Sequence, residues 1–367
     1  MPADPRRLGV PVRLCYNSWQ EKRALVLEGL IGLMVMKSGT KSRLWTFEEA
    51  LALVCDESQA LSRPVIAFLS GAGRAEVGQF ADCWGQASPE RRRELISAMV
   101  EMAEADFELD FNAIFRWSLQ SEDPVVRERA IEGLWEDEQP GLIDPLLRLM
   151  KDDPAPEVRA QAAASLGRFA LQAELGDLSE GRAALVRQGL LEVIDSQSEI
   201  AQVRRRAIES IAYMSEAPVD NIIDRAYADP DEKMRLSAVF AMGRTADPHW
   251  AEAVRRELKS ASPAMRYEAA RAAGEIALKW MAGELIALLT DRDAEVRQMA
   301  VWALGQVGGG YARRALQACQ ASRDEAMREA AEEALSELGF GSAPLDMFYY
   351  EAEGGAEAEP ETEADEE

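Results

Sequence analysis

The sequence predicts an all-α protein, an α-solenoid (α-α superhelix) built from repeated two-helix units. One short pattern, Val-Arg or Met-Arg followed by Ala three residues after the arginine, occurs seven times between residues 126 and 331. The last five of these arginines, at positions 204, 235, 266, 297 and 328, are spaced by 31 residues. Each copy also follows another apolar segment with helical spacing. A fixed period of this size is typical of a solenoid whose units bury their apolar faces against their neighbours.

One face of the second helix in each unit carries small and apolar residues. Counted from the arginine, position −1 is Val or Met, position +3 is always Ala, and position +7 is Leu, Ile, Met or Ala. These three positions share one helical face, so we expect them to pack against neighbouring helices. The arginines themselves are Arg127, Arg159, Arg204, Arg235, Arg266, Arg297 and Arg328.

These seven arginines are predicted to form a structural ladder. An Asp or Ser six residues earlier suits the start of a helix, and Pro124, Pro154 and Pro230, which follow acidic residues, suit its first turn. A cation close to the positive end of a helix is unfavourable. Each arginine therefore needs a partner, and the candidates are the Asp or Ser side chain or a carbonyl of the adjacent turn.

The first helix of each unit is predicted from apolar segments between the arginine-bearing helices. The spacing from Arg159 to Arg204 is 45 residues, and the excess lies in Gln172 to Arg182, where we expect a longer loop or a helix extension. The predicted first helices include Leu142–Met150, Ala183–Ile194, Val219–Tyr227, Trp250–Leu258, Trp280–Leu289 and Tyr311–Cys319.

The chain divides into four predicted regions. Residues 1–44 do not match the repeat; they form an extra amphipathic helix, Trp19 to Met36, or precede a native start at Met34 or Met36. Residues 45–105 form a divergent helical region with a capping box at Thr46 and Glu49 and a degenerate repeat over 89–103. Residues 106–340 hold seven repeats. Residues 341–367 hold an apolar-aromatic segment at 344–350, either a linear motif or a cap on the last repeat, and an acidic tail predicted to be disordered.

The charge argues against nucleic acid as a partner. The net charge is −24, although residues 1–43 carry eight basic and three acidic residues and residues 351–367 carry nine acidic residues and no basic one. An acidic body repels a phosphate backbone. The apolar run at 24–36 is too short to span a membrane. Cys15, Cys55, Cys83 and Cys319 show no metal or redox spacing, so we expect free thiols and a cytoplasmic protein.

The unit resembles the HEAT repeat, in the short form found in phycobilisome lyases. The residues that carry the resemblance are the Asp and Pro before the second helix, Val-Arg, the following Ala, and Leu-Gly at its end. The resemblance implies a non-enzymatic scaffold for protein partners, here without a cofactor. The alternatives it implies are a bilin lyase or a hydroxylase of the deoxyhypusine type. His249 is the only histidine, so a di-iron site built on several histidines is disfavoured.

A candidate partner-binding surface lies on the opposite face of the second helices, at positions +1, +4, +5 and +8. In an array of this type these helices usually line the concave side. Large apolar residues on a face that should contact water indicate a binding strip, and the acidic body favours a basic protein partner. The alternative is packing against the neighbouring unit. The candidate residues are Trp135, Arg205, Leu236, Phe240, Tyr267, Arg271, Gln298 and Trp302.

Overall fold

The computed structural model describes residues 45–215 and 218–340, and the chain divides into two compact units, Met1–Trp250 and Ala251–Glu367. The described residues are helical and contain no strand. This confirms the all-α prediction.

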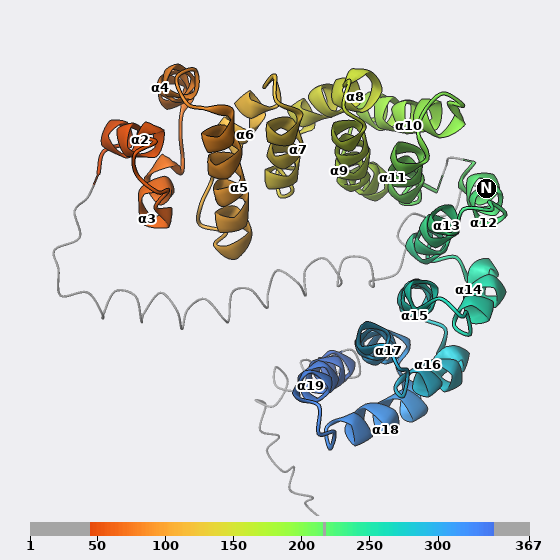
Figure 1. Ribbon diagram of the computed structural model, residues 1–367. Coiled ribbons are helices and arrows are strands. Elements are labelled where there is room, and N and C mark those ends of the chain that lie inside the picture. The colour runs from red at the N-terminus through yellow and green to blue at the C-terminus, as the bar shows by residue number, and fades with distance from the viewer. Residues whose placement is uncertain (1–44, 216–217, 341–367) are drawn as a thin grey trace, which may run out of the picture. The chain divides into compact units, whose positions relative to one another are not determined.

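Unit 1 begins with two short helices and continues with helix pairs (Figure 1). Helices α2 (Phe47–Cys55) and α3 (Arg63–Ile66) precede the pairs, and Thr46 and Glu49 form the predicted capping box at the start of α2. The pairs are α4 (Arg74–Trp84) with α5 (Pro89–Ala105), α6 (Asn112–Ser118) with α7 (Pro124–Gly133), α8 (Ile143–Asp152) with α9 (Pro156–Leu175), α10 (Glu180–Asp195) with α11 (Ala201–Ile211), and α12 (Val219–Tyr227) with α13 (Glu232–Arg244).

Unit 2 contains three further pairs. They are α14 (Ala251–Glu257) with α15 (Pro263–Ile276), α16 (Ala282–Leu288) with α17 (Ala294–Val307), and α18 (Gly309–Cys319) with α19 (Glu325–Phe340). Short 3-10 turns, Pro140–Leu142, Pro248–Trp250 and Lys279–Met281, lead into α8, α14 and α16. The predicted first helices therefore lie where the sequence placed them.

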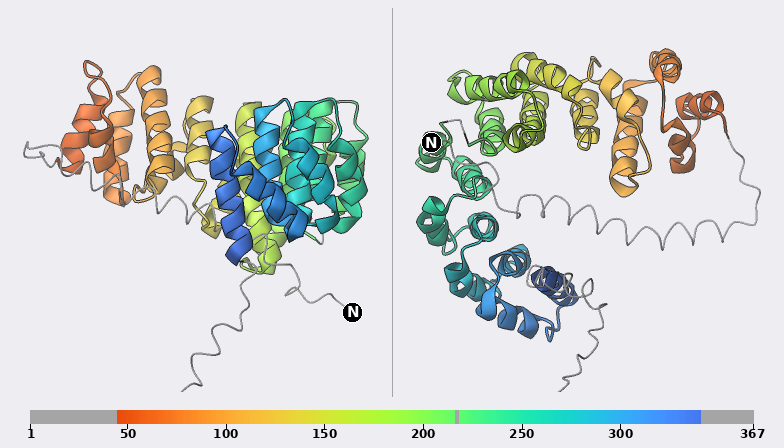
Figure 2. Two further views of the ribbon diagram at one scale, coloured as in Figure 1. Left: turned by 90° about the horizontal axis from the view of Figure 1, so that it is seen from below. Right: turned by 180° about the vertical axis from the view of Figure 1, so that it is seen from behind.

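Each unit has two layers of helices. In unit 1, α5, α7, α9, α11 and α13 pack in succession against one another, whereas α4 and α8 contact α6 and α10 respectively. In unit 2, α17 packs between α15 and α19, and α16 packs against α18. We call these the second-helix layer and the first-helix layer. Figures 1 and 2 show the same separation within each unit.

The predicted apolar stripe forms the core between the layers. Position −1 is buried in all seven repeats, and so is the alanine at position +3. Position +7 is buried from Leu134 to Leu304, whereas Leu335 of the last helix is partly exposed. Position +4 is buried as well in the first six repeats, from Ile131 to Val301. The prediction that +4 belongs to the outward face was therefore wrong, because a helix packed on two neighbours buries a wider arc than one stripe.

Glycines eight residues after the arginine allow successive second helices to approach closely. A methyl group added to Gly167 would lie 3.0 Å from Ser210 Oγ, and one added to Gly305 would lie 3.0 Å from Ala334 Cβ. Ser210 and Ala334 both occupy position +6 of the following repeat. Small residues at +6 and +8 thus set the spacing of the second-helix layer, a role that the repeat pattern alone did not reveal.

The last repeat ends the array with polar side chains. Position +4, apolar and buried in the six preceding repeats, is the exposed Glu332 in α19. In the first-helix layer, Ala282 of α16 is buried, whereas its counterpart in α18 is the exposed Arg313. A polar outer face of this kind is typical of a terminal repeat in an array.

The insertion after Arg159 extends α9, the second helix of that repeat, and α10, the first helix of the next repeat. Helix α9 is 20 residues long and ends at Gly176, which has a left-handed backbone conformation with φ 80°. Helix α10 is 16 residues long. The expected helix extension is therefore confirmed, and only a short turn lies between α9 and α10.

The helix starts differ from the predicted ones by two residues. The capping residue lies four positions before the arginine, as Asp123, Asp231 and Asp293, each of which accepts a backbone N–H of the first turn. The Asp or Ser at −6 instead accepts from the backbone of this capping residue, as Asp291 Oδ1 does from Asp293 N at 2.9 Å. Pro124 is in the first turn as predicted, whereas Pro154 and Pro230 precede their helices.

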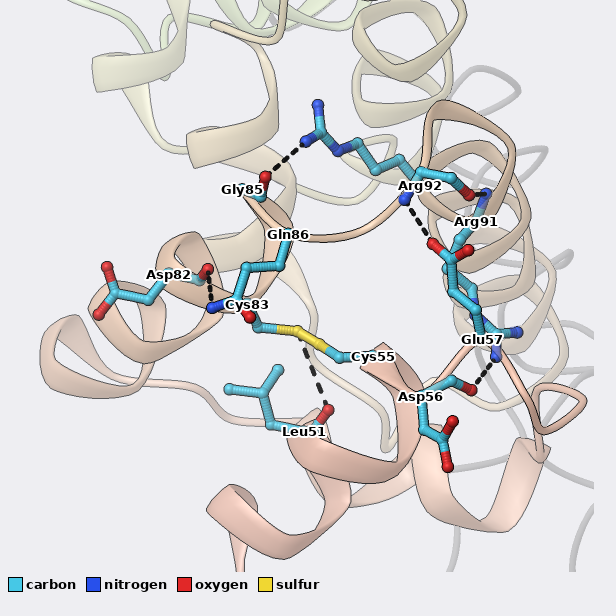
Figure 3. Close-up of a disulfide and its surroundings, with 11 residues drawn as sticks. Leu51, Cys55, Asp56, Glu57, Asp82, Cys83, Gly85, Gln86, Arg91 and Arg92 are labelled. Atoms are coloured by element: carbon cyan, nitrogen blue, oxygen red, sulfur yellow. Dashed lines mark hydrogen bonds between the residues drawn. A yellow bond between two sulfur atoms is a disulfide. The ribbon is translucent and has the colours of Figure 1, made fainter.

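Cys55 and Cys83 form a disulfide between α2 and α4 (Figure 3), so the prediction of free thiols was wrong for this pair. Their Cα atoms are 6.2 Å apart, within the range that a disulfide spans. The two cysteines are 28 positions apart, and the chain between them folds into helices that bring them together, which sequence spacing alone does not show. Cys319 is a free, partly buried thiol.

Several predictions concern residues that the structure does not describe. The proposed helix at 19–36, the alternative starts, Cys15, segment 344–350 and the acidic tail all lie outside the described residues. Among the described residues, no helix is long and apolar enough to cross a membrane.

Candidate functional site

The seven arginines of the predicted ladder lie near the starts of the second helices and reach back to the preceding turn. In six of them, Nη1 donates to the backbone carbonyl six residues earlier, as Arg127 does to Ser121 O at 2.7 Å. The same nitrogen also reaches the next carbonyl, five residues before the arginine, such as Glu122 O at 3.0 Å. These carbonyls follow the first helix and lack helical partners. The guanidinium therefore joins the two helices of one repeat.

The other side of the guanidinium pairs with a carboxylate of the following repeat. Arg127 Nε and Nη2 donate to the two oxygens of Asp153, each at 2.7 Å. Arg266 donates to Asp291 at 2.7 and 2.8 Å. Both acids are the residue at −6 of the next repeat, not of the arginine's own repeat as the sequence suggested. Each of these residues thus links one repeat to the next.

The ladder is not uniform along the chain. Arg159 donates to Glu199, one residue beyond the serine at −6, with both distances 2.9 Å. Arg297 makes a longer contact, with its Nη2 at 3.8 Å from Oδ2 of the half-exposed Asp324. Arg204 Nε is buried and has no hydrogen-bond partner among the described residues. An acid at or next to position −6 of the following repeat therefore permits this link but does not guarantee it, because Asp229 occupies that position after Arg204.

In the degenerate first repeat, three adjacent arginines make contacts of this kind, and Figure 3 shows two of them, Arg91 and Arg92. Arg92 Nη2 donates to Gly85 O at 3.3 Å, at the end of α4. Arg93 Nε donates to Asp123 Oδ2 of the next repeat at 2.6 Å. Arg91 is buried and donates to the carbonyls of Asp56 and Gln59, which follow α2. Because Arg91 occupies the position of Val or Met in the other repeats, this change ties the helix pair to α2.

Two ion pairs of the ladder, Arg266–Asp291 and Arg159–Glu199, lower the pKa values of their carboxylates. Hydrogen bonds from Arg266 lower the pKa of Asp291, although burial opposes this effect. Burial raises the pKa of Glu199, but the hydrogen bonds from Arg159 and the Ile200 backbone outweigh it, so the net shift is downward. Both carboxylates are therefore held in the ionised form that the arginines need.

The candidate partner-binding residues do not form one exposed strip. Gln298 is exposed, whereas Leu236, Phe240 and Tyr267 are partly exposed. Trp135 is also partly exposed but lies in the turn after α7. The remaining three candidates, Arg205, Arg271 and Trp302, make structural contacts.

In unit 2, one of these candidates packs against a neighbouring helix and another is buried on its own helix. A methyl group on Gly274 would lie 2.6 Å from the Trp302 ring, so the indole of α17 covers the glycine of α15. Arg271 is buried and forms ion pairs with Glu268 and Glu275 of its own helix, both at 3.0 Å. Packing against the neighbouring helix is therefore the better interpretation for Trp302, whereas Arg271 serves ion pairs within α15.

In unit 1, α11 and α13 bring aromatic and cationic side chains together. The Arg244 guanidinium lies 5.1 Å from the ring centre of Phe240 and 5.5 Å from that of Tyr213. Tyr213, in the turn after α11, was not among the predicted residues, although it stands nine positions after Arg204 as Arg244 stands nine after Arg235. Both aromatic rings and Leu236 are partly exposed. We call this group, Tyr213, Leu236, Phe240 and Arg244, the α11–α13 cluster.

A polar network fixes the helices beneath this cluster. Arg205 Nε donates to Ser237 Oγ at 2.9 Å, and Ser237 Oγ donates to the buried Glu209 at 2.6 Å. Glu209 also accepts from Arg206 at 2.6 Å. Because these bonds join α11 to α13, Arg205 positions the cluster and does not itself extend to a partner.

An acidic surface lies on α7 of the same unit. Burial raises the pKa of Glu128, and the neighbouring Glu157 and Glu132 raise it further, whereas Arg129 opposes the shift. Glu128 occupies the same repeat position as Leu236. Glu128 therefore lies among like charges that Arg129 offsets only in part.

Within 45–215 and 218–340, no group of three or more His, Cys, Asp or Glu side chains is arranged to hold a metal ion. His249 is exposed, its Nδ1 lies 3.1 Å from Asp247 Oδ2, and its ring stacks on Trp250. These contacts belong to the turn before α14.

The repeat geometry agrees with a comparison against known families. A model of HEAT repeats matches residues 113–212, 219–280 and 251–336, more than half of the 367 residues. The chain belongs to the HEAT-repeat family. No curated protein matches this HEAT-repeat chain by sequence.

Solved structures similar to this HEAT-repeat protein are distant. A designed armadillo repeat protein is 22% identical with a TM-score of 0.36, over 55% of this chain and all of its own. An engineered protein is 18% identical with a TM-score of 0.38, over 80% and 88% of the two chains. Human deoxyhypusine hydroxylase is 19% identical with a TM-score of 0.27, over 80% and 97%.

Proposed function

We propose that this HEAT-repeat protein is a non-catalytic scaffold that binds a protein partner on its second-helix layer, with the α11–α13 cluster at the centre of the contact in unit 1. The observation that carries the proposal is the stacking of Arg244 on Phe240 and Tyr213, which are partly exposed. Aromatic residues and arginine contribute most to binding energy at protein interfaces. Repeat arrays present such residues on extended surfaces.

The charges on the same layer favour a basic partner segment. Burial and neighbouring acids raise the pKa of Glu128, so its carboxylate is less well stabilised than that of a fully exposed glutamate. A lysine or arginine of the partner would restore a favourable environment for that carboxylate. The net charge of −24 would also accelerate the encounter with a basic partner at low salt.

Affinity capture from the native host tests the aromatic centre. We expect Phe240→Ala to reduce recovery of the specific partner at least about tenfold, since hot-spot truncations cost about 2 kcal/mol or more. The control is Leu185→Ala, which removes a 45% exposed side chain from α10 in the first-helix layer. Both variants should keep wild-type helicity and melting. Equal recovery with both variants would contradict the proposed centre.

The charge preference has a separate test. With the captured partner purified, Glu128→Gln should weaken binding, and the weakening should be smaller at about 0.5 M salt than at about 0.05 M because salt screens exposed charges. An unchanged affinity would show that the acidic surface is not part of the contact.

The proposed role needs no catalytic group. The 31-residue period is the feature shared with lyase-type repeats, and the two enzyme alternatives make distinct predictions. A lyase of that type would co-purify with a coloured pigment, and a hydroxylase would co-purify with iron. Absorption spectra and metal analysis of the purified protein therefore separate the scaffold from both enzymes.

A further inference from the structure

Helix α18 presents an exposed aromatic and basic face on the first-helix layer of unit 2. Tyr311 is 73% exposed, the highest value among the large hydrophobic residues of the described chain. The Arg314 guanidinium lies 4.9 Å from the centre of its ring. Because this face is separate from the second-helix layer, a role for it is independent of the proposed scaffold function.

Helix α18 itself carries charge opposite to that of the protein as a whole. No acidic residue occurs between Glu295 and Asp324, whereas Arg313, Arg314 and Arg323 fall in that interval. Arg313 and Arg314 are both exposed. In a chain of net charge −24, this is a local surface that attracts carboxylates.

The chain leaves the described structure beside this surface. Helices α18 and α19 pack together, and a methyl group on Gly308, just before α18, would lie 3.1 Å from Leu338 Cδ2, near the end of α19. Residues 344–350, PLDMFYY, come a few positions later, followed by Glu351 and Glu353. An aromatic segment with carboxylates therefore starts next to an aromatic surface with guanidinium groups.

We infer that residues 344–353 of this chain dock on α18, with their aromatic side chains against Tyr311 and their carboxylates beside Arg314. The tether is long enough, because about six extended residues after Phe340 span up to about 20 Å, whereas a helix of 11 residues is about 16 Å long. A short tether also holds the segment at millimolar effective concentration, which makes a weak contact sufficient.

The competing position for this segment is the end face of the last repeat. That face carries Glu332 at the position where the earlier repeats carry buried apolar residues. Glu329 and Glu333 on the same helix are exposed too. Like charges repel, so the acidic residues of segment 344–353 favour α18 over α19.

Photo-cross-linking in the full chain tests the docking. p-Benzoylphenylalanine replaces Phe348, and the irradiated protein is cleaved after acidic residues. Because no acid lies between Glu295 and Asp324, α18 is contained in one fragment, Val296–Asp324. We expect the cross-links to fall mainly on this fragment within the same chain, and their yield to drop several-fold between about 0.05 and about 0.5 M salt.

Two variants and a matched control complete the experiment. Tyr311→Ala and Arg314→Gln should each reduce the yield several-fold, whereas Arg256→Gln, at an exposed arginine of α14, should leave it unchanged. None of the three changes an acidic cleavage site. Cross-links to α19, to a second copy of the chain or to scattered positions would overturn the inference, and so would a yield insensitive to both variants.

Discussion

Arg127 and Asp153 form a bidentate ion pair between successive repeats, with both nitrogen-oxygen distances at 2.7 Å. The two residues are 8% and 7% exposed, so the pair is shielded from water. The same guanidinium also holds two carbonyls after α6. One side chain therefore joins both helices of its repeat to the repeat after it.

This relationship predicts that the rungs of the ladder differ in strength. Arg127→Met should destabilise its repeats by about 3–5 kcal/mol, because it leaves the buried Asp153 carboxylate without its cation. Arg297→Met should cost about 1 kcal/mol or less in ion pairing, since Asp324 is 3.8 Å away and half exposed. Hydrogen exchange of α7–α9 and α17–α19 measures each effect locally. Similar losses of protection in the two places would contradict this ranking.

Acid should weaken the Arg266–Asp291 rung. The pKa of Asp291 is lower in the folded protein than its ordinary value of 3.8, mainly because Arg266 donates to it. The ionised carboxylate therefore stabilises the fold above about pH 4, and this contribution is lost as the pH falls below that value. The stability difference between wild type and Asp291→Asn, measured by urea unfolding, should be largest near neutral pH and shrink as the solution is acidified past the ordinary pKa. A constant difference would exclude the titration of Asp291 as its source.

The left-handed residue after α15 offers a stabilising substitution. Ala277 has φ 57°, a conformation that costs a non-glycine residue roughly 1–2 kcal/mol, and Gly308 occupies the same repeat position with φ 62°. Ala277→Gly should stabilise unit 2 by about 0.5–1 kcal/mol after the entropy cost of glycine. Ala253→Gly, inside α14, should instead destabilise by about 1 kcal/mol. Thermal unfolding of both variants checks the opposite signs.

A single substitution on the polar end face of the last repeat should make the protein self-associate. Glu332→Val restores the apolar residue that the other repeats bury at this position, so the last repeat should then accept another apolar surface. Light scattering should show a larger average mass that rises with protein concentration. Glu329→Val removes the same charge at an exposed position one turn earlier and should leave the mass at the wild-type value. A mass increase in both variants would indicate a general loss of charge repulsion instead.

Which candidate residues are exposed depends on contacts between repeats, and a comparison of the repeat sequences does not show these contacts. The alignment placed Trp302 on the outward face, yet the missing side chain of Gly274 allows the indole to cover the neighbouring helix. Tyr213 was overlooked because it follows the end of α11, where helical periodicity no longer applies. Arg244 links it to Phe240 across two repeats. Side-chain size in one repeat therefore decided which residues of the next repeat remain exposed.

The sequence by itself determined the array of two-helix units, the buried positions −1, +3 and +7, and the arginine near each second-helix start, because these features repeat within a few residues of one another. Only the tertiary structure decided that Asp153 and Asp291 serve the preceding repeat, that Cys55 meets Cys83, and which apolar side chains stay partly exposed. The physical reason is that helical periodicity is a local property. Ion pairs, disulfides and close packing instead depend on which of several chemically similar groups the folded chain brings within reach.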